Sequence, residues 1–422
     1  MPDLPIRPAV LASPDYPFSA VTAPIKLDQN ESFEDFPAEL KDLALERLRE
    51  LPWHRYTDLN ADALCNAVAR HDGWAPEGTV VTTGSNVLIA LLIQLSAMGG
   101  GRVLTVKPNF ALYGLDARLL GAELTEVPLR EDQSVDFDAL IAALGQASGP
   151  AARGVIYLPR PHAPTGSLCS LGDVERLALA SQGWLLVIDE AYHHFMDSED
   201  ARALARRHPH VVLLRTLSKA WGLAGLRMGY ALTSDGVARQ LRKLVPPFGV
   251  SVLQTVCTLV ALEHPGYVQA RVAHTLKGTA GSIGATALQA EAAALEQALH
   301  ERAAQAALEP LLQVCLAQLE PLVSALASWL AARQATDQQA PDAAALVEPP
   351  DAPALRAALQ RLERLLQDSD SAAEQAWDQD AALFRFCLGA RWGEVDAALR
   401  GFDYEQALQV LREAAPVSGV TT

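Results

Sequence analysis

The chain has 422 residues, of which 50% are hydrophobic, and a formal net charge of −16 at pH 7. This length suggests two or three domains with a sizeable core, the acidic balance argues against nucleic acid as a partner, and no apolar run is long enough to cross a membrane. Because the start also lacks the basic-then-apolar layout of a signal peptide, we expect a cytoplasmic protein without a membrane partner.

Short β-branched runs alternate with helical patterns from about residue 79 to residue 232. The first run, 79–83, is followed by a helix-like stretch at 86–98. Strands that alternate with helices predict a mostly parallel sheet with helices on both faces. The further predicted strands are 102–106, 123–129, 154–159, 184–189, 211–216 and 228–233.

The composition changes at residue 274. From there on the chain is rich in Ala, Leu, Glu and Gln and has almost no β-branched runs, which predicts an all-helical region. Within it, residues 334–353 are rich in proline, alanine and acidic residues, and this composition predicts a linker between helices.

Unusual polar groups stand at the ends of two predicted strands. Gly84, Ser85 and Asn86 lie between a strand and a helix, where free backbone N–H groups and the helix dipole favour a phosphate. Asp189 and Glu190 end an apolar strand, and a carboxylate buried there needs a cationic partner.

The stretch 211–230 carries a candidate nucleophile. Lys219 follows a strand and a Thr-Leu-Ser turn, and Arg227 comes after a glycine-rich loop. A lysine at the mouth of a parallel sheet is desolvated, which makes it a nucleophile toward an aldehyde. Ser218 and Arg227 would hold an anion beside it.

Residues 1–272 resemble the pyridoxal-phosphate-dependent aminotransferases of fold type I, and among these the histidinol-phosphate aminotransferases. The resemblance rests on motifs that occur in the family's order. They are KLDQNES, RYTDLNADAL, TTGSN, PNFALYG, PHAPTG, VIDEAY, RTLSKAWGLAGLRMGY and PPFGVSVLQ. The resemblance implies an α/β large domain with a mostly parallel sheet, pyridoxal 5'-phosphate as cofactor and a homodimer.

The resemblance also implies roles for single residues. Lys219 would form the Schiff base with the cofactor and move the Cα proton, and Asp189 would pair with the pyridinium nitrogen. Tyr192 would bond the ring hydroxyl, Tyr113 would stack on the ring, and Asn30 lies in the family's substrate segment. The other implied cofactor-binding residues are Gly84, Ser85, Asn86, Thr216, Ser218 and Arg227, with Tyr56 from the second subunit. No metal is expected, because the five cysteines form no CxxC pair.

The chain departs from the family pattern at two places. Ala163 stands where the family commonly has an asparagine that touches the ring hydroxyl. The family's later small domain, with a strand whose arginine binds the substrate carboxylate, does not appear, and Arg385 in LFRFCLGARW is its only partial echo.

A histidine and several glycines begin the helical region, in RVAHTLKGTAGSIGA. Lys277, Gly278 and Gly281 are three, four and seven residues after His274, so on a helix they share its face. Each glycine costs about 1 kcal/mol in a helix relative to alanine. Small residues there would expose the imidazole to a second protein, and Lys277 would offset the charge of a phosphoryl group.

This stretch resembles the histidine phosphotransfer (HPt) domain of phosphorelays. The resemblance implies a helical bundle of residues 273–333 and 354–415, in which His274 accepts a phosphoryl group from an aspartate of a response-regulator receiver domain. The residues 354–415 resemble the closing helices of such domains, particularly in FDYEQAL.

The leading hypothesis is an aminotransferase that moves an amino group between L-histidinol phosphate and 2-oxoglutarate, giving imidazole-acetol phosphate and L-glutamate, with an appended phosphorelay module. One alternative is a signalling phosphotransfer protein whose aminotransferase-like domain does not turn over substrate. A second alternative within the enzyme class is threonine-phosphate decarboxylase.

Overall fold

The computed structural model describes residues 5–13, 29–32, 34–145, 153–196, 200–282, 285–301, 306–319, 321–322, 352–367, 372–388, 391–400 and 404–414. It divides the chain into two compact units. The described helices and strands up to residue 322, including the whole sheet, belong to the first unit, and those from residue 352 belong to the second.

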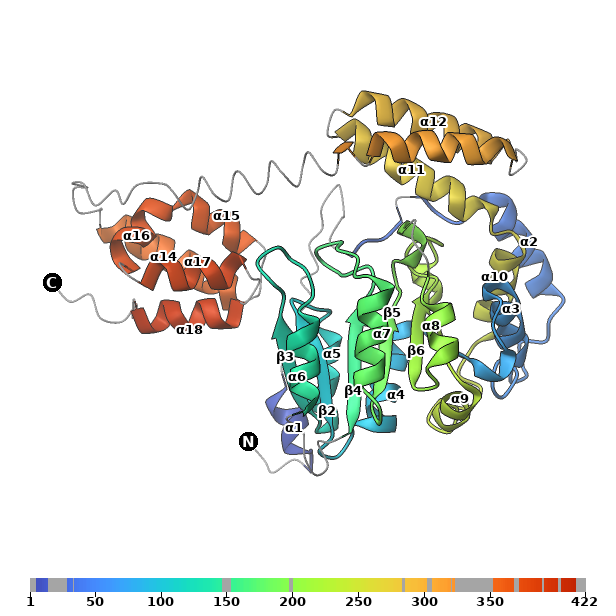
Figure 1. The fold of residues 1–422 in the computed structure, drawn as a ribbon, viewed down its shortest axis with the longest axis horizontal. Coiled ribbons are helices and arrows are strands. Elements are labelled where there is room, and N and C mark those ends of the chain that lie inside the picture. Colours follow the sequence, from blue (N-terminus) through green and yellow to red (C-terminus); the bar gives the residue numbers. More distant parts are fainter. Residues whose placement is uncertain are drawn as a thin grey trace. The chain divides into compact units, whose positions relative to one another are not determined.

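The first unit is built on one seven-stranded sheet (Figure 1). Each predicted β-branched run forms a strand within one or two residues of its expected bounds. The runs of β4 and β6 are buried along their whole length, as is typical of strands covered on both faces. The strands are β1 (Thr79–Thr82), β2 (Arg102–Lys107), β3 (Glu123–Pro128), β4 (Gly154–Pro159), β5 (Leu185–Asp189), β6 (Val211–Thr216) and β7 (Gly229–Leu232).

The strand order is β1-β7-β6-β5-β4-β2-β3. β2, β3, β4, β5 and β6 are parallel to one another, and β7 lies between β1 and β6 and runs antiparallel to both. The predicted mostly parallel sheet is therefore confirmed. The carboxyl ends of β1 and of the parallel strands lie at the same edge of the sheet.

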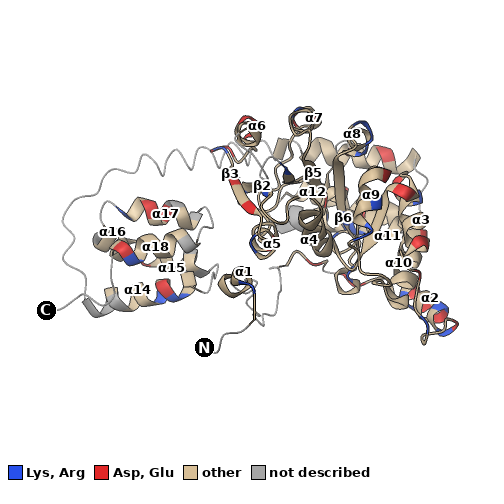
Figure 2. Ribbon diagram, turned by 90° about the horizontal axis from the view of Figure 1, so that it is seen from below, with Lys and Arg blue, Asp and Glu red and all other residues tan. Residues whose placement is uncertain are grey.

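Helices cover both faces of the sheet (Figure 2). Alternate strand residues, such as Val155 and Val187 on one face and Ile156 and Ile188 on the other, enter two separate apolar cores. One core contains α4 (Ser85–Ser96), α5 (Leu112–Leu120) and α9 (Asp235–Leu241); the other contains α6 (Phe137–Gly145), α7 (Leu171–Ala180) and α8 (Arg202–Arg207). This three-layer arrangement is the one that the alternation of strands and helices predicts.

Three further helices extend the second core beyond the sheet. They are α2 (Ala38–Arg49), α3 (Asp62–Asp72) and α10 (Val252–Glu263). Ser251 starts α10 with a capping box, in which its hydroxyl and the Gln254 side chain each bond the other residue's backbone N–H. The remaining short elements of the sheet region are α1 (Pro8–Ala12) and the 3₁₀ turns Pro76–Gly78, His193–Phe195 and Ala224–Leu226.

A long helix leaves the sheet region and begins a small helical bundle. α11 (Gly266–Ser282) pairs with α12 (Thr286–His300), and residues 306–319 are also helical. Ala273, Leu288, Leu295 and Cys315 form the buried core of this bundle. α11 passes through Gly278 and Gly281 without interruption, as the helical pattern predicts.

The second unit consists of helices around a core of its own. Trp377 lies at the centre of this core, stacked on Phe384 at 5.0 Å and on Trp392 at 5.6 Å between ring centroids. Its helices are α14 (Ala352–Gln367), α15 (Ala372–Gln379), α16 (Ala381–Leu388), α17 (Trp392–Arg400) and α18 (Tyr404–Ala414).

The predicted HPt-like helices fall into both units, with α11 and α12 in the first and α14–α18 in the second. Most of the predicted linker 334–353 lies outside the described residues. Among the helices that the structure describes, none combines the length and apolar composition needed to cross a bilayer.

Candidate active site

The sheet topology brings the predicted site residues to one edge. Gly229, the first residue of β7, pairs with Thr82 at the end of β1 and with Thr216 at the end of β6. The turn after β1, with Gly84, therefore lies beside the turn after β6, with Ser218. Asp189 ends the next strand, β5, which is paired with β6.

The turn at Gly84 has a backbone conformation that disfavours a side chain, and the Arg227 guanidinium lies against it. Gly84 has a φ of +100°, and a Cβ there would lie 2.6 Å from Nη2 of Arg227. A Cβ on Gly229 would lie 2.1 Å from the backbone nitrogen of Ser85, the first residue of α4. Backbone N–H groups at this helix start and the Arg227 guanidinium therefore converge where a phosphate is expected.

The hydroxyl groups of Thr216, at the end of β6, and of Ser218, in the turn after it, lie together. The Thr216 Oγ1 lies 3.0 Å from the Ser218 Oγ and accepts the Ser218 backbone N–H at 3.1 Å. Nη1 of Arg227 lies 3.5 Å from the Ser218 Oγ. The structure thus brings together Thr216, Ser218 and Arg227, as the sequence predicts, beside the Gly84 turn.

Asp189 has a phenol and a backbone amide as partners. The Tyr113 hydroxyl donates to its Oδ2 at 2.7 Å, and the backbone N–H of Ala191 donates to its Oδ1 at 3.1 Å. Burial raises the pKa of Asp189, and these two hydrogen bonds oppose that rise. The cationic partner predicted for the carboxylates of this strand end belongs to Glu190 instead.

Tyr113 is placed differently from the expected stacking position. It is 1% exposed, and its ring is stacked on Tyr157, with the centroids 4.5 Å apart and the planes 6° apart. Phe110, three residues earlier, is only partly buried and meets the edge of Tyr113 at 5.8 Å. Sequence reasoning missed Phe110, although PNFALYG contains both aromatic residues.

Lys219 and Tyr192 lie next to each other. The Lys219 Nζ is 5.8 Å from the centroid of the Tyr192 ring and donates to the backbone carbonyl of Gln29 at 2.7 Å. The Asn30 Nδ2 donates to the Tyr192 hydroxyl at 2.8 Å. The predicted substrate residue Asn30 is therefore in the same place as the predicted nucleophile.

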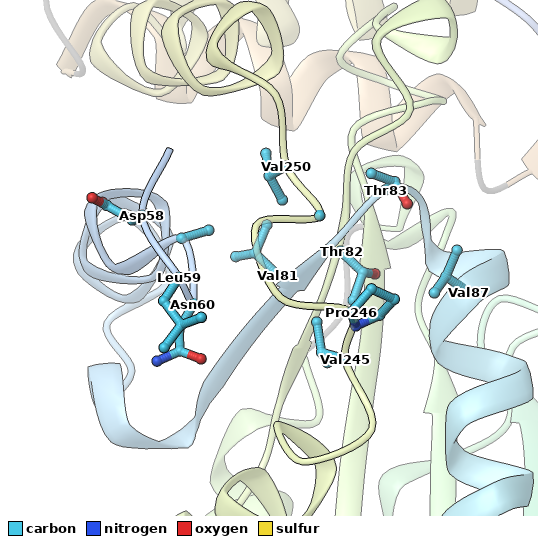
Figure 3. Close-up of a pocket in the computed structure, with 12 residues that line it drawn as sticks. Asp58, Leu59, Asn60, Val81, Thr82, Thr83, Val87, Val245, Pro246 and Val250 are labelled. Carbon is cyan, nitrogen blue, oxygen red and sulfur yellow. The ribbon is translucent and has the colours of Figure 1, made fainter. Parts of the chain in front are cut away.

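Tyr56 projects outward from this face. It is 86% exposed and packs only on Phe248 among the aromatic rings of the described residues, at 5.0 Å. Figure 3 shows the cavity next to this segment, between Asp58–Asn60, the end of β1 and the loop at Pro246–Val250. At about 30 Å³, this cavity has room for one or two water molecules and not for a cofactor.

Arg215 is the cation that the strand ends require, and sequence reasoning missed it. Its Nε donates to Glu190 at 2.7 Å and its Nη1 to Asp72 at 2.8 Å. All three side chains are almost fully buried. The signal was present, because Arg215 follows the apolar run VVLL, where a charged residue must be paired.

His274 is half-buried between α11 and α12, not fully open to a second protein. Its Nδ1 lies 2.5 Å from Oε1 of Glu296, and the Lys277 Nζ lies 2.5 Å from Oε2 of the same carboxylate. The His274 side chain is 32% exposed. Sequence reasoning missed Glu296, which stands on the facing helix. Nothing is described of the surroundings of Gly278 and Gly281 beyond their helical backbone.

Comparison with known families identifies the first unit. The family model for aminotransferase class I and II matches residues 22–306. The chain belongs to this aminotransferase family. The match covers the sheet, the turns at Gly84 and Lys219, and the helices up to α12. The expected enzyme class, a pyridoxal-phosphate-dependent aminotransferase, is confirmed.

Curated relatives resemble the same part of this aminotransferase. The chain is 47% identical to a histidinol-phosphate aminotransferase of Deinococcus radiodurans over 273 residues, 64% of this chain and 74% of that protein. It is 36% identical to the enzyme of that name from Thermococcus kodakarensis over 248 residues, 59% of this chain and 70% of that protein.

A solved structure supports the same assignment. The histidinol-phosphate aminotransferase of Sinorhizobium meliloti, solved in complex with pyridoxal-5'-phosphate, superposes with a TM-score of 0.55 at 28% identity. The alignment covers 61% of this chain and 70% of that one. Arg385, the partial echo of the small-domain arginine, lies in helix α16 of the second unit and not in a strand.

The residues at the sheet edge fit such a cofactor. The cradle at Gly84 is one that a Cβ would fill, and it is lined by a guanidinium and by backbone N–H groups, as a phosphate requires. Asp189 offers a carboxylate to a protonated ring nitrogen, and Lys219 offers an amine next to Tyr192.

Proposed function

We propose that the chain is a pyridoxal-phosphate-dependent aminotransferase of the histidinol-phosphate type. It would move the amino group of L-histidinol phosphate to 2-oxoglutarate, giving imidazole-acetol phosphate and L-glutamate. The observation that carries the proposal is the joint placement of Lys219, Asp189 and the Gly84 cradle at one sheet edge. The name of the relative that is 47% identical supports the choice of substrate.

The side chains at this edge would divide the work between holding and proton transfer. When bound, the cofactor supplies an aldehyde and an electron-withdrawing ring. Asp189 would hold the ring nitrogen, and Tyr192 would donate to the ring hydroxyl. The Lys219 amine would take the Cα proton of the amino donor and return it to the carbon of the cofactor aldehyde.

The phosphate of the cofactor would rest on the start of α4. Gly84, Ser85 and Asn86 would offer backbone N–H groups, while Ser218 and Arg227 would add a hydroxyl and a guanidinium. Thr216 orients Ser218 through the 3.0 Å contact between their hydroxyl oxygens. Ala163 supplies no amide toward the ring hydroxyl, so Tyr192 would carry that contact.

The outer side of the cofactor site would be completed by Phe110, by Asn30 and by a second subunit. The partly buried Phe110 has a ring free of the tight stack that engages Tyr113, and it would pack on the cofactor ring. The 86% exposed Tyr56 would reach the phosphate of the partner subunit in a homodimer. Asn30 would contact the substrate.

The proposal is tested by incubating the purified chain and pyridoxal phosphate with L-histidinol phosphate and 2-oxoglutarate. We expect stoichiometric L-glutamate and imidazole-acetol phosphate. Carbon dioxide released in a parallel incubation with threonine phosphate, with no glutamate formed in the first, would instead favour the decarboxylase. Neither product, from protein that binds the cofactor, would overturn the enzyme assignment.

We further propose that His274 accepts a phosphoryl group, because the Glu296 carboxylate bonds its Nδ1 and so orients the ring. The Glu296 carboxylate accepts a hydrogen bond from Nδ1, and in the neutral ring with its proton at Nδ1 the lone pair is on Nε2. Nε2 would attack the phosphorus of an aspartyl phosphate on a receiver domain. The phosphorus–oxygen bond to that aspartate breaks, and its carboxylate leaves. Lys277 would offset the charge of the phosphoryl group.

Glu296→Ala is expected to slow phosphorylation of His274 by about tenfold, since the Nδ1 proton loses its acceptor. The effect is measured as the initial rate of ³²P transfer to His274 from a receiver domain, which phosphoramidate as a small-molecule donor has phosphorylated. Glu291→Ala on the same helix is the matched control and should leave the rate unchanged. Label that remains in His274→Gln would place the acceptor elsewhere.

A further inference from the structure

Tyr113 and Asp189 form a buried pair that reaches across the sheet edge. Tyr113 is on α5, which follows β2, whereas Asp189 ends β5, and β4 lies between these two strands. The 2.7 Å hydrogen bond therefore joins two segments that no backbone pairing connects. At 1% exposure the Tyr113 side chain has no direct access to solvent.

The Tyr113 ring is engaged by other aromatic rings. Tyr157 lies parallel to it at 4.5 Å, and Phe110 meets it nearly perpendicularly, at 86°, with the centroids 5.8 Å apart. Tyr157 is itself fixed, because its hydroxyl donates to the Ile89 carbonyl at 2.7 Å. This packing sets the Tyr113 hydroxyl, and not its ring face, toward the site.

The hydrogen bond has a defined direction. Burial and the nearby Asp189 raise the pKa of Tyr113 well above its usual value, so the phenol stays protonated and donates. With Tyr113 on Oδ2 and the Ala191 N–H on Oδ1, each carboxylate oxygen still has a lone pair. Asp189 can thus accept a third donor while both of these bonds remain.

We propose that Tyr113 is a positioning residue that keeps Asp189 ionised and aimed at the ring nitrogen of the cofactor, and that it does not stack on the ring. The inference rests on the proposed function for the identity of the third donor. Its physical basis is that a buried carboxylate loses its charge unless donors replace the water around it. Tyr113 is one of the two such donors that the structure gives Asp189.

The substitution Tyr113→Phe separates the two roles, because it keeps the ring and removes the hydroxyl. We expect the pKa of Asp189 to rise by about one pH unit, a tenfold change in proton affinity. We also expect pyridoxal phosphate to dissociate about tenfold more readily. A stacking residue would change neither quantity when Tyr is replaced by Phe.

Tyr157→Phe is the matched control. It removes a buried hydroxyl with one hydrogen bond from the same aromatic stack, but this hydroxyl does not touch Asp189. It should lower stability by about as much as Tyr113→Phe and leave the pKa of Asp189 unchanged. Phe110→Ala should weaken cofactor binding without shifting that pKa.

The pKa of Asp189 is measured from the carboxyl ¹³C resonance of the aspartate-labelled full chain without cofactor, assigned with Asp189→Asn. Cofactor affinity is measured separately from the visible absorption band. An unchanged pKa in Tyr113→Phe, or an equal shift in Tyr157→Phe, would overturn the inference. A wild-type chain that binds no cofactor would refute the proposed function alone, because the ¹³C titration does not depend on it.

Discussion

Replacing Lys219 by alanine is expected to lower the rate of amino-group transfer by about 10³-fold or more. The Lys219 Nζ lies 5.8 Å from the Tyr192 ring centroid and reaches the segment that carries Asn30, the predicted substrate residue. The variant would therefore lose both the amine that captures the cofactor aldehyde and the base that moves the Cα proton.

The measurement is glutamate formation at saturating substrate, together with the visible spectrum before and after borohydride. Borohydride should fix the cofactor to the wild-type chain and not to Lys219→Ala. Lys243→Ala is a suitable control, because Lys243 follows α9 and its amine donates to the exposed Gln240 side chain at 2.6 Å. A fully active Lys219→Ala protein would remove the basis of the proposed mechanism.

Comparing the single variants Lys219→Ala and His274→Gln separates the enzyme hypothesis from the signalling hypothesis. The first variant should lose transamination and retain phosphorylation at His274, and the second should do the reverse. A wild-type chain that is phosphorylated on His274 but transfers no amino group would favour the phosphotransfer protein with a non-catalytic aminotransferase-like domain.

The sequence predicted the central strands well because both of their faces are buried. Runs such as VVLLRT and GVIYLP are apolar at consecutive positions, which is typical of central strands. It did not predict that β7 runs antiparallel between β1 and β6, because the pattern of a buried strand carries no information on its direction. That insertion is what sets Arg227 beside Gly84.

The sequence predicted the site residues that stand in local motifs. It did not predict the contacts between segments that are distant in the chain. Gly84, Ser218 and Arg227 stand in short turns, and the structure brings them together. The partners of Asp189 and Glu190 come from other elements, and the sequence alone could not distinguish the phenol of Tyr113 from the guanidinium of Arg215.

The helical region illustrates the same limit. The periodicity of His274 and Lys277 predicted a shared helix face, and both residues do meet the same carboxylate. That carboxylate, Glu296, belongs to the facing helix, and a helical pattern does not specify which helix will pack against it. The same limit applies to the predicted bundle, whose helices fall into two compact units.

Arg215→Met is expected to destabilise the first unit by about 3–5 kcal/mol, the usual effect of removing one partner from a buried ion pair. Arg215 is 1% exposed and bonds Glu190, at 0%, and Asp72, at 4%. Methionine fills similar space but leaves two buried carboxylates without their cation. Arg215 also precedes Thr216 and Glu190 follows Asp189, so the loss occurs where two strands enter the site.

The effect is measured as the shift of the urea unfolding midpoint at constant slope. Arg207→Met provides the comparison, because Arg207 is paired with Glu175 on the surface, at side-chain exposures of 55% and 36%. An exposed pair of this kind contributes about 0.2–1 kcal/mol. Equal shifts for the two variants would mean that the buried carboxylates are neutralised in another way, by protonation or by water. A much larger shift for Arg215→Met would establish the ion pair as the link that holds α3, β5 and β6 together beneath the site.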